Sequence, residues 1–147
     1  MATIRQVYKN IHAVKFPKIV RETIIQHKTN MEDLNREQMV RGYDRDDERI
    51  GAYASEQYEN EKRRMNPAAS GWVDLKYTGS FHNLLTMKLL KDNIFTFYSK
   101  DKKNKDLVET WGSNIFGLST KSREDLIDEY GFKKSLVTNY KKAAKLI

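Results

Sequence analysis

The densest group of side chains that could take part in chemistry is a short acidic run. Residues 44–48 hold four carboxylates and one arginine, a composition that a calcium site could use. An EF-hand loop also needs a glycine at its sixth position and a bidentate glutamate at its twelfth. Those positions carry Arg49 and Ser55. The run therefore predicts a solvated acidic loop, with a weak cation site as the metal-binding alternative.

The residue types of the common catalytic centres are scarce elsewhere. The chain has no cysteine, which excludes thiolate catalysis, disulfides and cysteine-based zinc sites. Its three histidines, His12, His27 and His82, have no second ligand-type residue at helical or turn spacing. No glycine-rich phosphate loop or nucleophile elbow is present, and Thr-Gly-Ser at 78–80 predicts a plain turn after a strand. We expect no enzyme, no metal and no cofactor; residues 44–48 with a histidine are the one candidate for an unrecognised active site.

Basic side chains outnumber acidic ones, which favours anionic partners. The chain carries 27 lysines and arginines against 20 acidic residues, a net charge of +7. Such a protein can bind nucleic acid, although lysines also keep sheet edges soluble and are favoured at helix C-termini. The candidates for phosphate contacts are Lys100, Lys102, Lys103, Lys105, Lys141 and Lys142. Because both ends of the chain are basic and residues 31–64 are acidic, head-to-tail contact between copies is an equal alternative.

Aromatic residues are frequent in the segments predicted to be loops and turns. Aromatic side chains bring a large contact area with few rotatable bonds, which makes them common anchors of interfaces. The candidates for interface or packing residues are Tyr53, Tyr58, Trp72, Phe81, Trp111 and Phe116. In a monomer the same residues would fill the core.

The apolar periodicity predicts the elements that position these side chains. Spacings of three and four over residues 3–41, with Ile4, Val7 and Ile11 at the start, predict a long N-terminal helix that ends at Gly42. Pro17 predicts a kink or break in that helix near residues 14–16. Strands are predicted at 72–77, 84–90 and 93–98, the last two as a hairpin that turns at 91–93. Helices are predicted to end near Met65, to span 106–111, to run from a capping box at Ser122 to Gly131, and to cover 132–147.

The order of these elements predicts a single α+β domain. Its long N-terminal helix and C-terminal helices are separate from a small antiparallel sheet of about three to four strands. We expect an N-terminal helical arm at 1–42, a mobile loop region at 43–71, and the sheet with the C-terminal helices at 72–147. No stretch has the roughly 20 apolar residues of a membrane helix, and the N-terminus has no secretory signal. The expected location is inside a cell, away from membranes.

Four stretches, read in order, resemble a known family. They are Gln38–Asp44 with Ile50–Tyr53, Tyr58 and Lys62; Val73–Phe81; the strand pair to Tyr98; and Leu107–Gly112 with Ile115–Leu118. As an ordered set over roughly residues 38–147, they resemble the small neck or tail-completion proteins of long-tailed bacteriophages. The chain departs from that pattern at residues 45–48, where relatives tend to carry a glycine turn, and in a more lysine-rich C-terminal helix.

The resemblance implies a virion structural protein without catalysis. It would form a homo-oligomeric ring of about six or twelve copies by head-to-tail contacts, join the portal or connector to the tail proteins, and have DNA passing through it. Its location would be the neck of the virion, and the host cytoplasm during assembly. Residues 43–71 would become ordered on docking. The alternative is a small basic nucleic-acid-binding protein.

Overall fold

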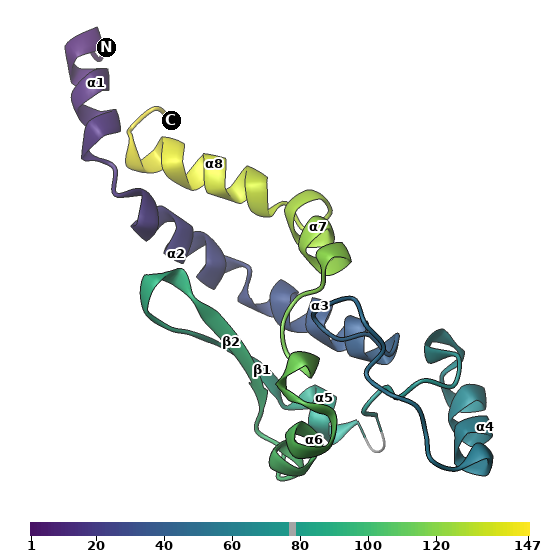
Figure 1. Cartoon of the computed structure of the whole chain (residues 1–147). Helices are drawn as coiled ribbons and strands as arrows, with labels where there is room; N and C mark the ends of the chain where they lie inside the picture. Colours follow the sequence, from purple (N-terminus) through teal and green to yellow (C-terminus); the bar gives the residue numbers. More distant parts are fainter. Residues whose placement is uncertain (77–78) are drawn as a thin grey trace.

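The computed structural model describes residues 1–76 and 79–147 and has a mixed helical and sheet fold. Its α-helices are α1 (Ile4–Ala13), α2 (Phe16–Gln26), α3 (Lys28–Val40), α4 (Glu56–Met65), α5 (Ser80–Asn83), α6 (Asn104–Trp111), α7 (Thr120–Asp128) and α8 (Phe132–Ala143). Short 3-10 helices lie at η1 (Pro67–Ala69), η2 (Lys91–Asn93) and η3 (Ser113–Ile115). The strands are β1 (Leu85–Leu89) and β2 (Phe95–Ser99). Figure 1 shows an elongated arrangement, with α1 and α4 at opposite ends.

The N-terminal segment forms three consecutive helices, so the single long helix is not confirmed. The predicted break is confirmed: α1 ends at Ala13 and α2 begins at Phe16, with Pro17 in its first turn. Proline is tolerated there because the first N–H groups of a helix have no partner within the helix. A second break, which no proline or glycine marks, lies at His27 between α2 and α3. There the buried His27 ring contacts the hydroxyl of Ser135 in α8, 2.8 Å away.

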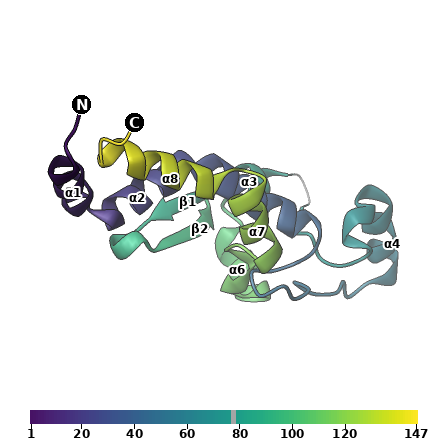
Figure 2. The ribbon, with the colours of Figure 1, turned by 90° about the horizontal axis from the view of Figure 1, so that it is seen from above.

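The central layer of the molecule is formed by α2 and α3. In both views α2 lies between α8 and the hairpin, and α7 packs against α3 (Figures 1 and 2). The buried apolar side chains of these layers form one core: Ile24, Met31, Leu34, Met39, Val73, Leu75, Phe81, Leu85, Met87, Phe97, Ile115, Phe116, Leu118 and Leu126. This core holds the central part of the chain together but does not include α1 or α4.

The predicted hairpin is confirmed. Strands β1 and β2 pair antiparallel with Met87 opposite Phe97, and both of these side chains are buried. The turn at η2 places Asp92 and Asn93 in the left-handed backbone region, which these two residue types tolerate better than most.

The predicted third strand is wrong for its described residues, and the sheet has two strands in the described part of the chain. Over residues 72–76 the backbone forms only an isolated bridge between Ala52 and Trp72. Leu75 has a φ of 58°, and the Asp74 carboxylate accepts a hydrogen bond from the Lys76 N–H. These features turn the chain instead of extending it. The rest of the predicted strand and Thr78 of the predicted turn lie outside the described residues.

The C-terminal helices are present as predicted, but three bounds differ: α6 begins at Asn104 instead of 106, α7 begins at Thr120 instead of Ser122, and α8 ends at Ala143 instead of 147. Helix α6 stops at Gly112, and Gly131 separates α7 from α8. The capping residue of α7 is Ser119, whose hydroxyl accepts a hydrogen bond from the N–H of Ser122. The prediction of a cap at Ser122 is therefore wrong: Ser122 lies inside the helix, where its side chain is buried and its hydroxyl donates a hydrogen bond to Oε1 of Gln38.

Within residues 43–71, the short helix predicted to end near Met65 is confirmed as α4. A bridge between Tyr43 and Arg49 closes the acidic loop. The mobility of this region stays a prediction.

Candidate functional site

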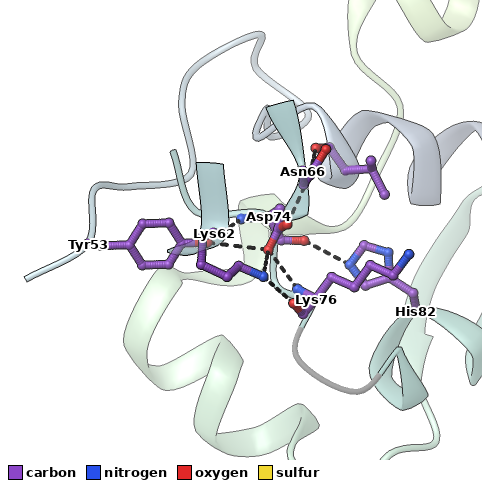
Figure 3. Close-up of polar contacts among 7 residues, drawn as sticks. Tyr53, Lys62, Asn66, Asp74, Lys76 and His82 are labelled. Carbon is purple, nitrogen blue, oxygen red and sulfur yellow. Dashed lines mark hydrogen bonds and ion pairs between the residues drawn. The ribbon is translucent and has the colours of Figure 1, made fainter. Parts of the chain in front are cut away.

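A buried polar cluster surrounds Asp74 and joins α4 to the loop before α5 (Figure 3). One carboxylate oxygen of Asp74 lies 2.8 Å from the ammonium of Lys62 and accepts from the Lys76 N–H at 2.9 Å. The same oxygen accepts from the Tyr53 hydroxyl at 3.3 Å, and the other accepts from the Asn66 amide at 2.9 Å. The ammonium of Lys62 also donates to the backbone carbonyl of Lys76.

The protonation states in this cluster suit a structural role. Burial raises the pKa of Asp74, but hydrogen bonds from Lys62, Asn66 and the Lys76 N–H outweigh it and hold that pKa below its usual value. Burial and the nearby Asp74 carboxylate raise the pKa of Tyr53. Burial lowers the pKa of His82, whose Nε2–H donates to the Asp74 carbonyl at 2.8 Å.

Both oxygens of the Asp74 carboxylate are therefore used by protein donors. A cavity of about 180 Å³ adjoins the cluster, lined by Val40, Lys62, Met65, Asn66, Asp74 and Lys76. Among the described residues, no buried side-chain nitrogen or oxygen lacks a hydrogen-bond partner. The contacts of Asp74 with Lys62 and Asn66 join α4 and the residue after it to the loop before α5, so the cluster fastens these segments together.

Carboxylates of the acidic loop, residues 44–48, also accept hydrogen bonds from backbone N–H groups. One Asp44 oxygen accepts from the N–H groups of Asp46 and Glu48, at 2.8 and 3.0 Å. Asp47 accepts from the N–H of Thr120, which ties the loop to the start of α7. In the described ranges, no group of three His, Cys, Asp or Glu side chains could hold a metal ion.

The six aromatic candidates occupy different environments. Phe81 and Phe116 belong to the buried core, with ring centroids 6.0 Å apart. Tyr53 and Trp111 are half-buried and pack against that core. The remaining two, Tyr58 and Trp72, keep more than a third of their surface exposed.

The six lysine candidates fall into two separate groups. All six side chains are exposed. Lys100, Lys102, Lys103 and Lys105 lie where β2 leads into α6, whereas Lys141 and Lys142 lie in the last turn of α8. Figure 1 places α6 and the end of α8 on opposite sides of the molecule, so the two groups do not form one continuous phosphate-binding path.

Helix α1 exposes a stripe of apolar side chains. It was predicted as part of the arm but not as a site. No residue of α1 is buried by the described part of the chain. Ile4 is 91% exposed, Tyr8 62% and Ile11 37%. In Figures 1 and 2, α1 extends past the end of α8 and away from the core. The signal in the sequence was an apolar stripe that Pro17 separates from the rest of the helical pattern.

An apolar hollow lies near α1, between the start of α2 and α8. Its volume is about 360 Å³, and it is lined by Phe16, Leu136, Val137, Tyr140, Lys141 and Leu146. Residues 132–147 contain five lysines and no acidic residue. This end of the molecule therefore combines exposed apolar surface with positive charge.

Helix α7 and the residue after it are net acidic, because residues 120–129 hold four carboxylates against Lys121 and Arg123. Glu124, Ile127 and Asp128 are exposed there, while Leu126 faces the core. Ile127 keeps 43% of its surface exposed beside the two carboxylates. The acidic loop lies beside the start of this helix, through the bond between Asp47 and Thr120.

Within the described residues, no helix has the length and apolar character needed to cross a membrane. Comparison with protein-family models, curated proteins and solved structures gave no match.

Proposed function

We propose that this chain is a non-enzymatic structural protein that works by assembling with other proteins. The observation that carries the proposal is the apolar stripe of α1, which the described residues leave exposed. Monomers seldom expose contiguous apolar surface without a partner for it. The Asp74 cluster, whose carboxylate oxygens are already used within the chain, supports a structural reading over a catalytic one.

The assembly that fits best is the ring of a phage neck or tail-completion protein. Its support is the ordered set of sequence stretches over residues 38–147 that resembles this family. An exposed basic helix at one end and an acidic helix surface elsewhere also suit head-to-tail contacts, which close into rings when the rotation allows. In this role the chain joins the capsid connector to the tail, within the virion.

The experiment is native mass spectrometry of the purified chain with negative-stain electron microscopy. The expected result is a closed ring of about six or twelve copies, whose mass does not change when duplex DNA is added at moderate salt. A chain that stays monomeric and changes mass only on binding DNA contradicts the proposal.

The second candidate is a small nucleic-acid-binding protein, favoured by the exposed lysines at 100–105 and 141–142. Binding to duplex phosphates weakens as salt is added. In a plot of the logarithm of the binding constant against the logarithm of salt concentration, each neutralised phosphate contributes about −0.9 to the slope. A DNA affinity that falls with salt in this way favours this candidate, provided that the variant Lys100→Glu/Lys102→Glu binds DNA more weakly than the wild-type chain. DNA binding that is absent at physiological salt removes it.

A further inference from the structure

Helix α1 has one apolar face and a basic flank beside it. At 100° per residue, Ile4, Tyr8 and Ile11 point to one side of the helix. Arg5 and Lys9 follow directly on the flank next to this stripe, one turn apart. Residues 1–15 contain no acidic residue. We call α1, with this stripe and these two cations, the basic arm.

Helix α7 carries the complementary pattern on its exposed side. Glu124 and Asp128 lie one turn apart, and Ile127 is exposed beside them. Residues three and four apart are neighbours on a helix surface, so Glu124 lies beside both Ile127 and Asp128, and the two carboxylates are on one side of the isoleucine. Lys121, also on this side, is paired with Asp125. We call the exposed side of α7 with these three residues the acidic face.

The charges on these two surfaces have no ion-pair partner within the described residues. The intrahelical pair of α7 uses Lys121 and Asp125 instead. Arg5 and Lys9 have the same four-residue spacing as Glu124 and Asp128, about 6 Å along a helix axis. Two helices that pack side by side can therefore pair both cations with both carboxylates while the isoleucines meet between them.

The basic arm cannot reach the acidic face of its own chain in this fold. Figure 1 shows α1 directed past the end of α8, while α7 lies at the other end of α8. The apolar hollow near α1 is a poorer acceptor, since Lys141 lines it and residues 132–147 carry five lysines and no carboxylate side chain that could pair with Arg5 and Lys9. The surface that remains as a binding partner for the basic arm is the acidic face of another copy.

We infer that the basic arm of one copy docks on the acidic face of the next copy. The inference rests on the proposed function and names the contact that would propagate the ring. Because the two surfaces differ, the contact is heterologous and repeats from copy to copy. A helix of ten residues is about 15 Å long, so one contact buries less than the roughly 800 Å² per partner of a stable pair. A single contact is therefore weak, and closure of the ring adds to its stability.

The test is sedimentation velocity over a concentration series up to about 1 mM, with paired variants. The arm variant is Ile4→Asp/Ile11→Asp, and the face variant is Glu124→Lys/Asp128→Lys. Each is expected to weaken self-association at least ~10-fold, with circular dichroism unchanged because all four side chains are exposed. The matched control, Lys141→Glu/Lys142→Glu, changes charge at the end of α8 and is expected to leave self-association within about threefold.

Two combinations separate this contact from any other. A chain with Arg5→Glu/Lys9→Glu and Glu124→Lys/Asp128→Lys together has both charges reversed and is expected to regain self-association. A mixture of the arm variant and the face variant holds one intact surface of each kind, so it is expected to form a 1:1 dimer and nothing larger.

Three results overturn the inference. If rings form and the arm variant still forms them, the contact lies elsewhere and the proposed function survives. If the wild-type chain stays monomeric across the series, a second copy is not the occupant of either surface. If the wild-type chain instead binds vesicles of anionic phospholipid and the arm variant does not, the basic arm belongs to a lipid surface.

Discussion

The ammonium of Lys62 lies 2.8 Å from the carboxylate of Asp74, and the two side chains are only 6% and 2% exposed. Twelve residues separate them, and the pair joins α4 to the loop that leads into α5. Lys62 is the only residue of α4 that is buried. The ion pair and the hydrogen bonds around it therefore hold that end of the molecule in place.

Asp74→Asn is expected to destabilise the fold by about 3–5 kcal/mol, because it leaves the buried Lys62 ammonium without a negative partner. Urea unfolding followed by circular dichroism measures this. The control is Asp125→Asn, which removes the more exposed pair with Lys121 and should cost less than about 1 kcal/mol. Equal midpoints for the two variants would show that the Asp74 pair is not a fastening.

The free energy of unfolding is expected to fall as the pH drops below about 6.5, the usual histidine value. Burial lowers the pKa of His82 and of His27 in the folded chain, so the unfolded chain binds protons first and is favoured. Unfolding in urea at pH 7.5 and pH 5.5 measures the loss. His82→Gln should reduce the difference in unfolding free energy between pH 7.5 and pH 5.5. His12→Gln, which changes an exposed side chain, should leave that difference unchanged.

The lowered pKa of Asp74 makes the free energy of unfolding depend on pH in a second range, which is more acidic than the range of the histidines. Its carboxylate stabilises the fold while ionised, so this contribution is lost as the pH falls from about 3.9, the usual aspartate value, through the lower folded value. A pH titration of unfolding free energy should therefore show two separate declines. The lower one should shrink in Asp74→Asn, and an unchanged lower decline would assign it to other carboxylates.

Gly51→Ala is expected to destabilise the chain by about 1–3 kcal/mol through overpacking. A Cβ at this position would lie 2.2 Å from Cζ3 of the Trp111 ring. The backbone of Gly51 is outside the left-handed region, so the cost comes from the ring and not from the backbone. Combined with Trp111→Phe, the loss should be smaller than the sum of the two single losses, as thermal unfolding would measure. Additive losses would mean that the ring moves aside.

Removal of apolar atoms from α1 should hardly change the stability of the monomer. Ile4→Ala is expected to alter the free energy of unfolding in dilute solution by less than about 0.5 kcal/mol, because this side chain is 91% exposed. Ile24→Ala, in the core, should cost about 2–5 kcal/mol. A large loss for Ile4→Ala would place α1 within the folded unit of one chain.

The sequence by itself determined the features that depend on neighbouring residues. The apolar spacing and Pro17 predicted helices with a break near residues 14–16, and alternation around residues 91–93 predicted the hairpin. Gly112 ends α6 as predicted. These features follow from backbone conformations and side-chain periods, which are local properties.

The tertiary structure decided the features that depend on contacts between distant segments. The alternation at residues 72–76 predicted a strand, but a buried Asp74 that pairs with Lys62 requires a turn there. The aromatic candidates could not be sorted by sequence, because burial of Phe81 against Phe116 joins positions 35 residues apart. The stripe of α1 was visible in the sequence, but only the packing of α2 against α8 showed that the chain leaves it exposed.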